Sequence, residues 1–165
     1  MTKQQLELVS DWFHASPHRV SALKAVNGIC VGSAAAAFFY GVLVRPGFHD
    51  PKLTLRLVLT CGVPFVLLSA VRHAVDLPRP FEVYDLEPLL PRETPGRGFP
   101  SRHVFSIFVI GTCFCYLEPW LGWTLIALGA ALGALRVLSA VHFERDVLVG
   151  AAVGILSGII GFGLI

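Results

Sequence analysis

Charged residues are scarce in this sequence. Asp, Glu, Lys and Arg make up 15% of its 165 residues, whereas they account for about a quarter of an average soluble domain. Hydrophobic residues make up 55% of the chain, and the mean hydropathy is +0.69. This balance is too apolar for an ordinary soluble domain and favours a protein embedded in a bilayer.

Two further absences exclude other classes of protein. The net charge is only +2, and the thirteen Lys and Arg residues form no continuous basic run, which argues against nucleic acid as a partner. The sequence also has no cluster of metal ligands, so we expect neither a metal nor a cofactor. All four cysteines lie in apolar stretches, where we expect buried thiols rather than disulfides; they are Cys30, Cys61, Cys113 and Cys115.

Long apolar runs dominate what the sequence does contain. About 20 helical residues span a hydrocarbon core about 30 Å thick. We therefore expect an all-α fold, a single polytopic membrane helical bundle over residues 1–165 with about five transmembrane helices. The expected spans are residues 26–44, 53–71, 103–117, 120–140 and 146–165.

Residues 1–25 are expected to form an amphipathic helix in front of the spans. Leu6, Val9, Trp12 and Phe13 recur at a spacing of three to four residues, with polar residues between them. This pattern suits a helix that lies in the membrane interface. A short soluble cap packed on the domain is the alternative, but Trp12 and Phe13 favour the membrane surface.

Glycines recur along one side of the last expected span. Gly150, Gly154, Gly158 and Gly161 are spaced by four, four and three residues, which is typical of a small-residue stripe for helix packing. The stripe fits packing within one chain or between the copies of a homo-oligomer, so both remain open.

Residues 72–102 form the only long polar segment of the sequence. Six prolines and two glycines stiffen and interrupt it. A connection of this length without regular structure is uncommon in a compact domain unless it is functional. We expect it to form a lid or rim over an active site. Counting the reversals of the chain places this segment on the same membrane face as the turn before the last span.

Polar side chains that could handle phosphate lie at the ends of these spans. His142 and Asp146 are four residues apart, so on a helix they would share a face, and the carboxylate could hold one imidazole nitrogen protonated. Arg136 lies near the end of an apolar run, where a charged side chain usually faces a bundle interior or a polar cavity. Together these residues could provide a nucleophile and a cation.

Two more clusters have the same character. Ser101 has the identity of a helix N-cap, which would place Arg102 and His103 in the first turn of a helix, where backbone N–H groups and the helix dipole attract anions. Arg72 and Arg79 are separated by a proline-containing segment that we expect to bend. The planar guanidinium group suits bidentate contact with phosphate.

The three clusters read Arg-x6-Arg-Pro, Pro-Ser-Arg-His and Arg-x5-His-x3-Asp. This pattern resembles the type 2 phosphatidic acid phosphatase (PAP2) superfamily, whose motifs are Lys-x6-Arg-Pro, Pro-Ser-Gly-His and Ser-Arg-x5-His-x3-Asp. The resemblance covers about residues 53–165. The sequence departs from the family at three positions, where it has Arg72 for Lys, Arg102 for Gly and Leu135 for Ser.

The resemblance implies a metal-independent lipid phosphatase that works through a phosphohistidine. His142 would attack the phosphorus, Asp146 would orient it, and His103 would protonate the leaving oxygen and later activate water. The remaining residues would bind the phosphate oxygens, and Arg102 would add a contact to a second phosphate or close the pocket in part; they are Arg72, Arg79, Ser101, Arg102 and Arg136.

Within this class, the first expectation for the substrate is a polyprenyl diphosphate or phosphate of the undecaprenyl type, held in the lipid bilayer. Phosphatidate or phosphatidylglycerophosphate is the alternative. A catalytically silent protein that binds or moves phospholipid is a reading of another class. The resemblance further implies an integral protein of the bacterial plasma membrane with an outward-facing site, whereas the count of positive charges mildly favours a cytoplasmic one.

Overall fold

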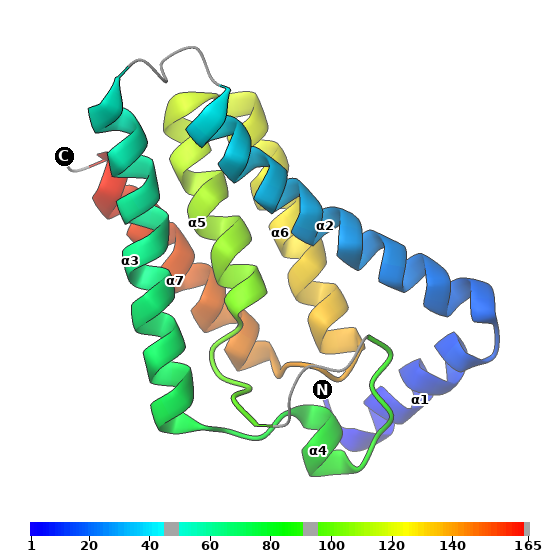
Figure 1. The fold of residues 1–165 in the computed structure, drawn as a ribbon. Coiled ribbons are helices and arrows are strands. Elements are labelled where there is room, and N and C mark those ends of the chain that lie inside the picture. Colours follow the sequence, from blue (N-terminus) through cyan, green and yellow to red (C-terminus); the bar gives the residue numbers. More distant parts are fainter. Residues whose placement is uncertain (45–49, 91–95, 164–165) are drawn as a thin grey trace.

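The computed structural model describes residues 1–44, 50–90 and 96–163, and in these ranges the regular structure is entirely helical (Figure 1). The prediction of an all-α polytopic bundle is confirmed. The helices are α1 (Lys3–His14), α2 (Pro17–Leu43), α3 (Pro51–Val75), α4 (Pro80–Tyr84), α5 (Arg102–Leu117), α6 (Pro119–Leu138) and α7 (Glu144–Gly163).

Four helical stretches are long and apolar enough to cross a membrane, and they contain α2, α3, α6 and α7. The remaining apolar helix, α5, has 16 residues, which corresponds to about 24 Å at 1.5 Å per residue. It is shorter than the other four but occupies the middle of the bundle, packed against α6 and α7 and flanked by α2 and α3. The protein is an integral membrane protein.

The glycine stripe of α7 packs directly on α5. A Cβ atom on Gly150 would lie 2.6 Å from the carbonyl oxygen of Ser101, and one on Gly154 would lie 2.7 Å from that of Phe105. Gly161 instead approaches Thr60 of α3. The close contact of the two backbones is possible because these positions carry no side chain.

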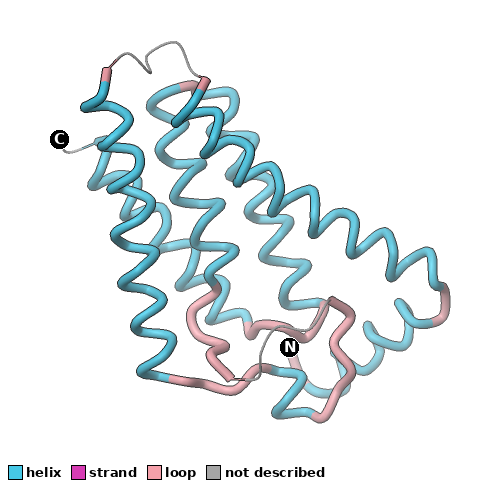
Figure 2. The backbone as a smooth tube through the Cα atoms, in the orientation of Figure 1, coloured by secondary structure: helices cyan, strands magenta, loops and turns pink. Residues whose placement is uncertain are grey.

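The described connections after α3 lie at the two ends of the bundle. The segment after α3, the short α4, the segment before α5 and the turn between α6 and α7 all lie at one end, as counting the reversals predicts (Figure 2). The turn between α5 and α6 lies at the other end. Residues from all three sequence motifs therefore gather at one end.

The N-terminal region differs in its boundaries from the expected helix over residues 1–25. Helix α1 ends at His14, and α2 begins at Pro17, because proline suits the first position of a helix. Helix α2 is thus one continuous helix that starts well before Val26. On α1, Leu6 is buried against the domain, whereas Leu8 and Trp12 are exposed. That exposed pair is available to the membrane surface.

The polar segment also differs from the sequence prediction in two features. Helix α3 extends past Arg72 to Val75 and ends at Asp76, whose φ of 40° is left-handed. The polar segment also contains the short helix α4. Part of that segment, residues 91–95, lies outside the described residues, as do residues 164 and 165 of the last expected span.

Candidate active site

His142 lies in the turn between α6 and α7. The backbone carbonyl of Arg136, in the last turn of α6, accepts hydrogen bonds from the N–H groups of Val141 at 3.2 Å and of His142 at 3.1 Å. Ala140 has a left-handed φ of 57°, and its carbonyl accepts a hydrogen bond from Phe81 N–H of α4 at 3.0 Å. The turn is therefore fastened both to α6 and to α4, which fixes the backbone of His142.

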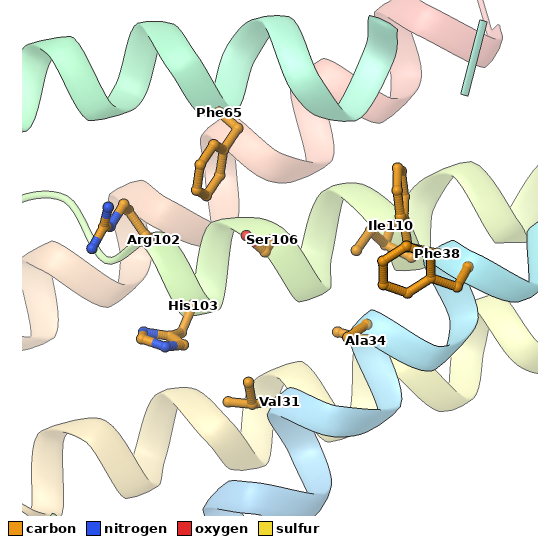
Figure 3. A pocket seen from close by; sticks show the side chains of 10 residues that line it. Val31, Ala34, Phe38, Phe65, Arg102, His103, Ser106 and Ile110 are labelled. Carbon is orange, nitrogen blue, oxygen red and sulfur yellow. The ribbon is translucent and has the colours of Figure 1, made fainter. Parts of the chain in front are cut away.

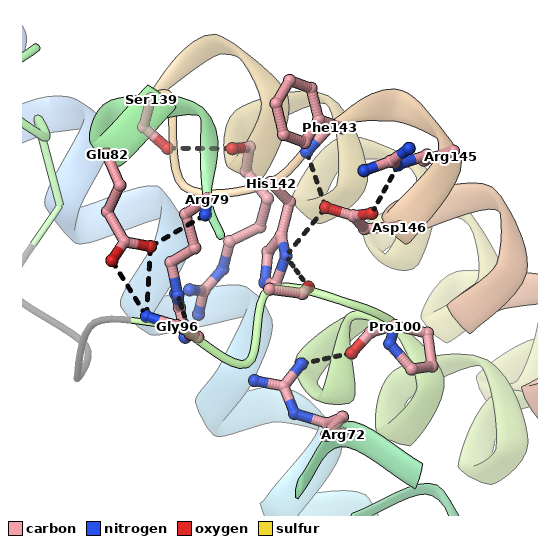
Figure 4. A network of polar contacts seen from close by, with 12 residues as sticks. Arg72, Arg79, Glu82, Gly96, Pro100, Ser139, His142, Phe143, Arg145 and Asp146 are labelled. Atoms are coloured by element: carbon pink, nitrogen blue, oxygen red, sulfur yellow. Dashed lines mark hydrogen bonds and ion pairs between the residues drawn. The ribbon is translucent and has the colours of Figure 1, made fainter. Parts of the chain in front are cut away.

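The imidazole of His142 lies beside two acceptors, the carboxylate of Asp146 that its spacing predicts and a backbone carbonyl that it does not. Because α7 begins at Glu144, His142 precedes the helix, and the two side chains do not stack on one helical face. The Nδ1 atom of His142 lies 2.8 Å from the carbonyl oxygen of Gly98, but 3.7 Å from Oδ2 of Asp146 (Figure 4). A carbonyl can only accept, so Nδ1 carries the proton and donates it to Gly98.

Asp146 has a second task in this arrangement. Its Oδ2 atom accepts a hydrogen bond from the N–H of Phe143 at 2.9 Å, which closes the turn in front of α7. Its backbone carbonyl accepts a hydrogen bond from Ser101 N–H at 2.9 Å. Arg145 lies 3.5 Å from the other carboxylate oxygen. Asp146 is 1% exposed, and its charge remains close to His142, although not in hydrogen-bond contact.

Three arginines of the motifs are buried at this end of the bundle. Arg72, Arg79 and Arg136 are 3%, 1% and 4% exposed, and they come from α3, the segment before α4, and α6. An Nη atom of Arg72 donates to the carbonyl of Pro100, and Nε of Arg79 donates to that of Gly96 at 3.1 Å (Figure 4). Buried cations on three separate elements are suited to an anion.

Ser101 is the N-cap residue of α5, as its identity predicts, but its hydroxyl makes no capping hydrogen bond. The Oγ atom is buried and has no hydrogen-bond partner among the described residues. A buried hydroxyl without a partner is costly in a folded protein. It is therefore available for a ligand that reaches the start of α5.

Arg102 and His103 are the first two residues of α5. They line the polar end of a groove of about 430 Å³ that runs between α2 and α3 over α5 (Figure 3). The rest of the lining is mostly apolar, and it includes Val31, Ala34 and Phe38 of α2 together with Phe65 of α3 and Ile110 of α5. Arg102 is exposed, and no hydrogen bond or ion pair joins its side chain to any described residue.

Sequence reasoning missed two parts of this site. Gly98 supplies the carbonyl next to His142, and Glu82 binds the segment that carries Gly98. A weak signal for Gly98 existed in the pair of glycines within a proline-rich segment. Within residues 1–44, 50–90 and 96–163, no three His, Cys, Asp or Glu side chains are arranged to hold a metal ion.

The chain matches the model of a known protein family. The model of the PAP2 superfamily matches residues 52–164. The chain belongs to the PAP2 superfamily and with it to the class of membrane lipid phosphatases. The match includes every motif residue described above and leaves out α1 and α2.

Named relatives extend the comparison over most of the chain. The undecaprenyl-diphosphatase BcrC of Bacillus subtilis is 27% identical over 153 residues, which are 90% of this chain and 78% of that protein. The lipid A 1-phosphatase of Porphyromonas gingivalis is 34% identical over 84 residues, which are 48% of this chain and 19% of that protein.

Solved structures show the same fold. The crystal structure of Aquifex aeolicus LpxE matches with a TM-score of 0.70 and 26% identity, covering 96% of this chain and 94% of that one. A transmembrane PAP2-type phosphatidylglycerolphosphate phosphatase from Bacillus subtilis matches with a TM-score of 0.69 and 19% identity, covering 98% and 83%. At that identity, the second match supports the fold alone.

Proposed function

We propose that this protein hydrolyses a polyprenyl-type lipid diphosphate, and more slowly the monophosphate, through a phosphohistidine formed on His142. The observation that carries the proposal is the juxtaposition of a buried histidine with buried arginines next to an apolar groove. Such a site can take a charged headgroup while the lipid tail stays in the apolar phase. The 27% identity with the undecaprenyl-diphosphatase over 90% of the chain favours this substrate class.

The proposed reaction has two steps. In the first, Nε2 of His142 attacks the terminal phosphorus, the bond to the bridging oxygen breaks, and His103 gives its proton to that oxygen. In the second, water attacks the phosphohistidine and passes a proton to His103, which releases inorganic phosphate and restores His142. The hydrogen bond from Nδ1 to Gly98 leaves the lone pair on Nε2 available for the attack.

The buried arginines would stabilise the negative charge of the phosphate oxygens during both steps. Arg72, Arg79 and Arg136 are buried where the dielectric constant is low, so their attraction for the equatorial phosphate oxygens is strong. The hydroxyl of Ser101 would donate to one of these oxygens, which satisfies a group that has no other described partner. Asp146 would stabilise the positive charge that develops on His142.

The groove gives Arg102 a separate role in the proposal. A lipid diphosphate has its terminal phosphate farthest from the tail and its inner phosphate next to the tail. Arg102 lines the groove at the first residue of α5, directly after Ser101, so it would contact the inner phosphate, which leaves as part of the lipid monophosphate. His103 lines the same end of the groove and would protonate the oxygen between the two phosphates.

The test is phosphate release by the purified protein in detergent, with a chelator present. The substrates are a polyprenyl diphosphate, a polyprenyl monophosphate, phosphatidate and phosphatidylglycerophosphate, and the variant is His142→Ala. We expect the fastest release from the diphosphate and a loss on the order of 10⁴-fold or more in the variant. His73→Ala is the matched control, since His73 is exposed on α3.

Other outcomes of this test contradict the proposal. Faster release from phosphatidate or phosphatidylglycerophosphate would show that the substrate is not a polyprenyl lipid. Release that the His142→Ala variant retains would exclude the phosphohistidine. No release from any lipid would favour a phospholipid-binding protein instead.

We further propose that the catalytic end of the bundle faces outward from a bacterial plasma membrane. The similarity to an undecaprenyl-diphosphatase of Bacillus subtilis supports this orientation. The test is labelling of single cysteines by a membrane-impermeant reagent in intact cells. A cysteine at exposed Glu87 should react and one at exposed Lys52 should not; the reverse pattern would indicate a cytoplasmic site.

A further inference from the structure

Two carboxylates that are not among the specified residues of the three motifs hold the segment that carries Gly98. Glu82 of α4 accepts hydrogen bonds from the backbone N–H of Arg79 at 2.8 Å and from that of Gly96 at 3.0 and 3.1 Å (Figure 4). Asp76, the residue that ends α3, accepts a hydrogen bond from the N–H of Arg97 at 3.0 Å. Two consecutive residues of the segment are therefore bound by carboxylates on two different elements.

Gly98 follows directly and is confined by its surroundings. Its N–H donates to the carbonyl of Leu77 at 2.7 Å. A Cβ atom at this position would lie 3.1 Å from the carbonyl oxygens of Leu77 and Pro78 and 3.3 Å from Cγ of Arg79. A side chain at this position would therefore push its neighbours away by a few tenths of an ångström. The position of the Gly98 carbonyl is thus set by residues 76 to 82.

The segment of residues 96–98 accepts hydrogen bonds from both the nucleophile and a cation of the proposed site. The carbonyl of Gly98 accepts the Nδ1 hydrogen bond of His142 at 2.8 Å. The carbonyl of Gly96 accepts a hydrogen bond from Nε of Arg79 at 3.1 Å, while Glu82 holds the backbone of Arg79 from the other side. Glu82 is therefore linked to the Arg79 guanidinium through Gly96, and to the His142 imidazole through Gly98.

We propose that Glu82 and Asp76 are positioning residues, a carboxylate clamp that sets the nucleophile through the backbone. The clamp holds the Gly98 carbonyl against His142, which keeps the proton on Nδ1 and directs the deprotonated Nε2 toward the phosphorus. It also holds Arg79 where the phosphate oxygens would lie. The inference rests on the proposed hydrolysis, and it assigns a role to two residues that the family motifs do not specify.

The two carboxylates should respond differently to amide substitution. The N–H of Gly96 lies 3.0 and 3.1 Å from the two carboxylate oxygens of Glu82, so in Glu82→Gln it would face an amide NH₂ whichever way the amide is turned. Asp76 accepts from a single N–H group with one oxygen, and Asp76→Asn can retain that oxygen. We therefore expect Asp76→Asn to hold the segment as the wild type does. Glu82→Gln and Asp76→Ala should both loosen it.

The kinetic experiment uses the full-length protein and the preferred lipid of the wild type. We expect kcat to fall about tenfold to a hundredfold in Glu82→Gln and Asp76→Ala, the range that follows from a misplacement of about 1 Å. KM should change by less than about twofold, because the groove that would bind the tail is unaltered. Glu87→Gln, an exposed carboxylate in the same segment, is the control and should resemble the wild type.

A second measurement separates the clamp from the proposed function. Hydrogen exchange of the peptide that contains residues 96–101 should be faster in Glu82→Gln and Asp76→Ala than in the wild type, with equal exchange in the core of α5. Unaltered exchange, or unaltered kcat in an active enzyme, would overturn the clamp. A fall in thermal stability that accounts for the whole loss of activity would also overturn it. A wild type that hydrolyses no lipid contradicts the proposed function, and the exchange measurement then decides whether the clamp exists.

Discussion

The carbonyl oxygen of Gly98 lies 2.8 Å from Nδ1 of His142, whereas the nearest carboxylate oxygen of Asp146 lies 3.7 Å from the same atom. The tautomer of the histidine is therefore set by the backbone of a distant segment. The carboxylate that shares the motif with His142 contributes its charge and closes the turn at Phe143.

The first prediction follows from this division of roles. Asp146→Asn retains an oxygen for the Phe143 N–H and loses only the charge, so we expect kcat to fall about tenfold to a hundredfold. Loss of the orienting group in a Ser-His-Asp triad, by contrast, costs about 10⁴-fold through the wrong tautomer. The measurement is kcat for the preferred lipid. A loss as large as that of His142→Ala would show that the carboxylate, and not Gly98, orients the imidazole.

The second prediction concerns Arg102 at the mouth of the groove. Arg102→Gly should lower kcat/KM for a polyprenyl diphosphate by about tenfold to a hundredfold, since a hydrogen bond to a charged group contributes about 1.5–3 kcal/mol. The value for the monophosphate of the same chain length should change little. Lys24→Ala removes another exposed cation and serves as the control. An equal loss for both lipids would contradict a contact with the inner phosphate.

The third prediction tests the packing of α7 on the start of α5. In Gly150→Ala the new Cβ would lie 2.6 Å from the carbonyl oxygen of Ser101, and a backbone atom cannot move away without shifting α5. We expect a loss of about 1–3 kcal/mol in stability and a marked loss of activity, measured by thermal unfolding in detergent and by phosphate release.

Gly28→Ala is the matched control for that variant. No heavy atom lies within 4 Å of a Cβ at this position, and alanine favours helix by up to about 1 kcal/mol over glycine. Its stability should be equal or higher. If both variants behaved alike, close packing at Gly150 would not be the cause of the loss.

The fourth prediction concerns the proposed use of the groove by a lipid tail. Ala35 lines the groove and is exposed, so Ala35→Trp should fill part of it. We expect a several-fold rise in KM for the long-chain lipid and unaltered hydrolysis of a short, water-soluble phosphate ester. Ala36→Trp, at an exposed neighbour that does not line the groove, should leave both substrates unaffected. A rise for both substrates in Ala35→Trp would indicate damage to the site.

Much of this protein could be inferred from residue order alone. A run of about 20 apolar residues crosses a bilayer as a helix, because a helix pairs the backbone N–H and C=O groups within the run itself. The helical bundle therefore follows from composition and spacing. Glycines at helical spacing on α7 predicted a packing face, which contacts α5. Because polar residues lie at the ends of the apolar runs, the sequence also predicted that Arg72, Arg79, Ser101 and His142 would gather at one end of the bundle.

Other features required the folded chain. Every residue carries a carbonyl acceptor, so the sequence contains no signal that Gly98 is the one that meets Nδ1 of His142. The contact of Glu82 with Gly96 joins residues on both sides of a long segment, and local spacing does not reveal such pairs. The groove exists because α2 and α3 flank α5 at an angle that depends on the packing of the whole bundle. Spacing determines which residues share an element, but long-range packing determines which atoms meet.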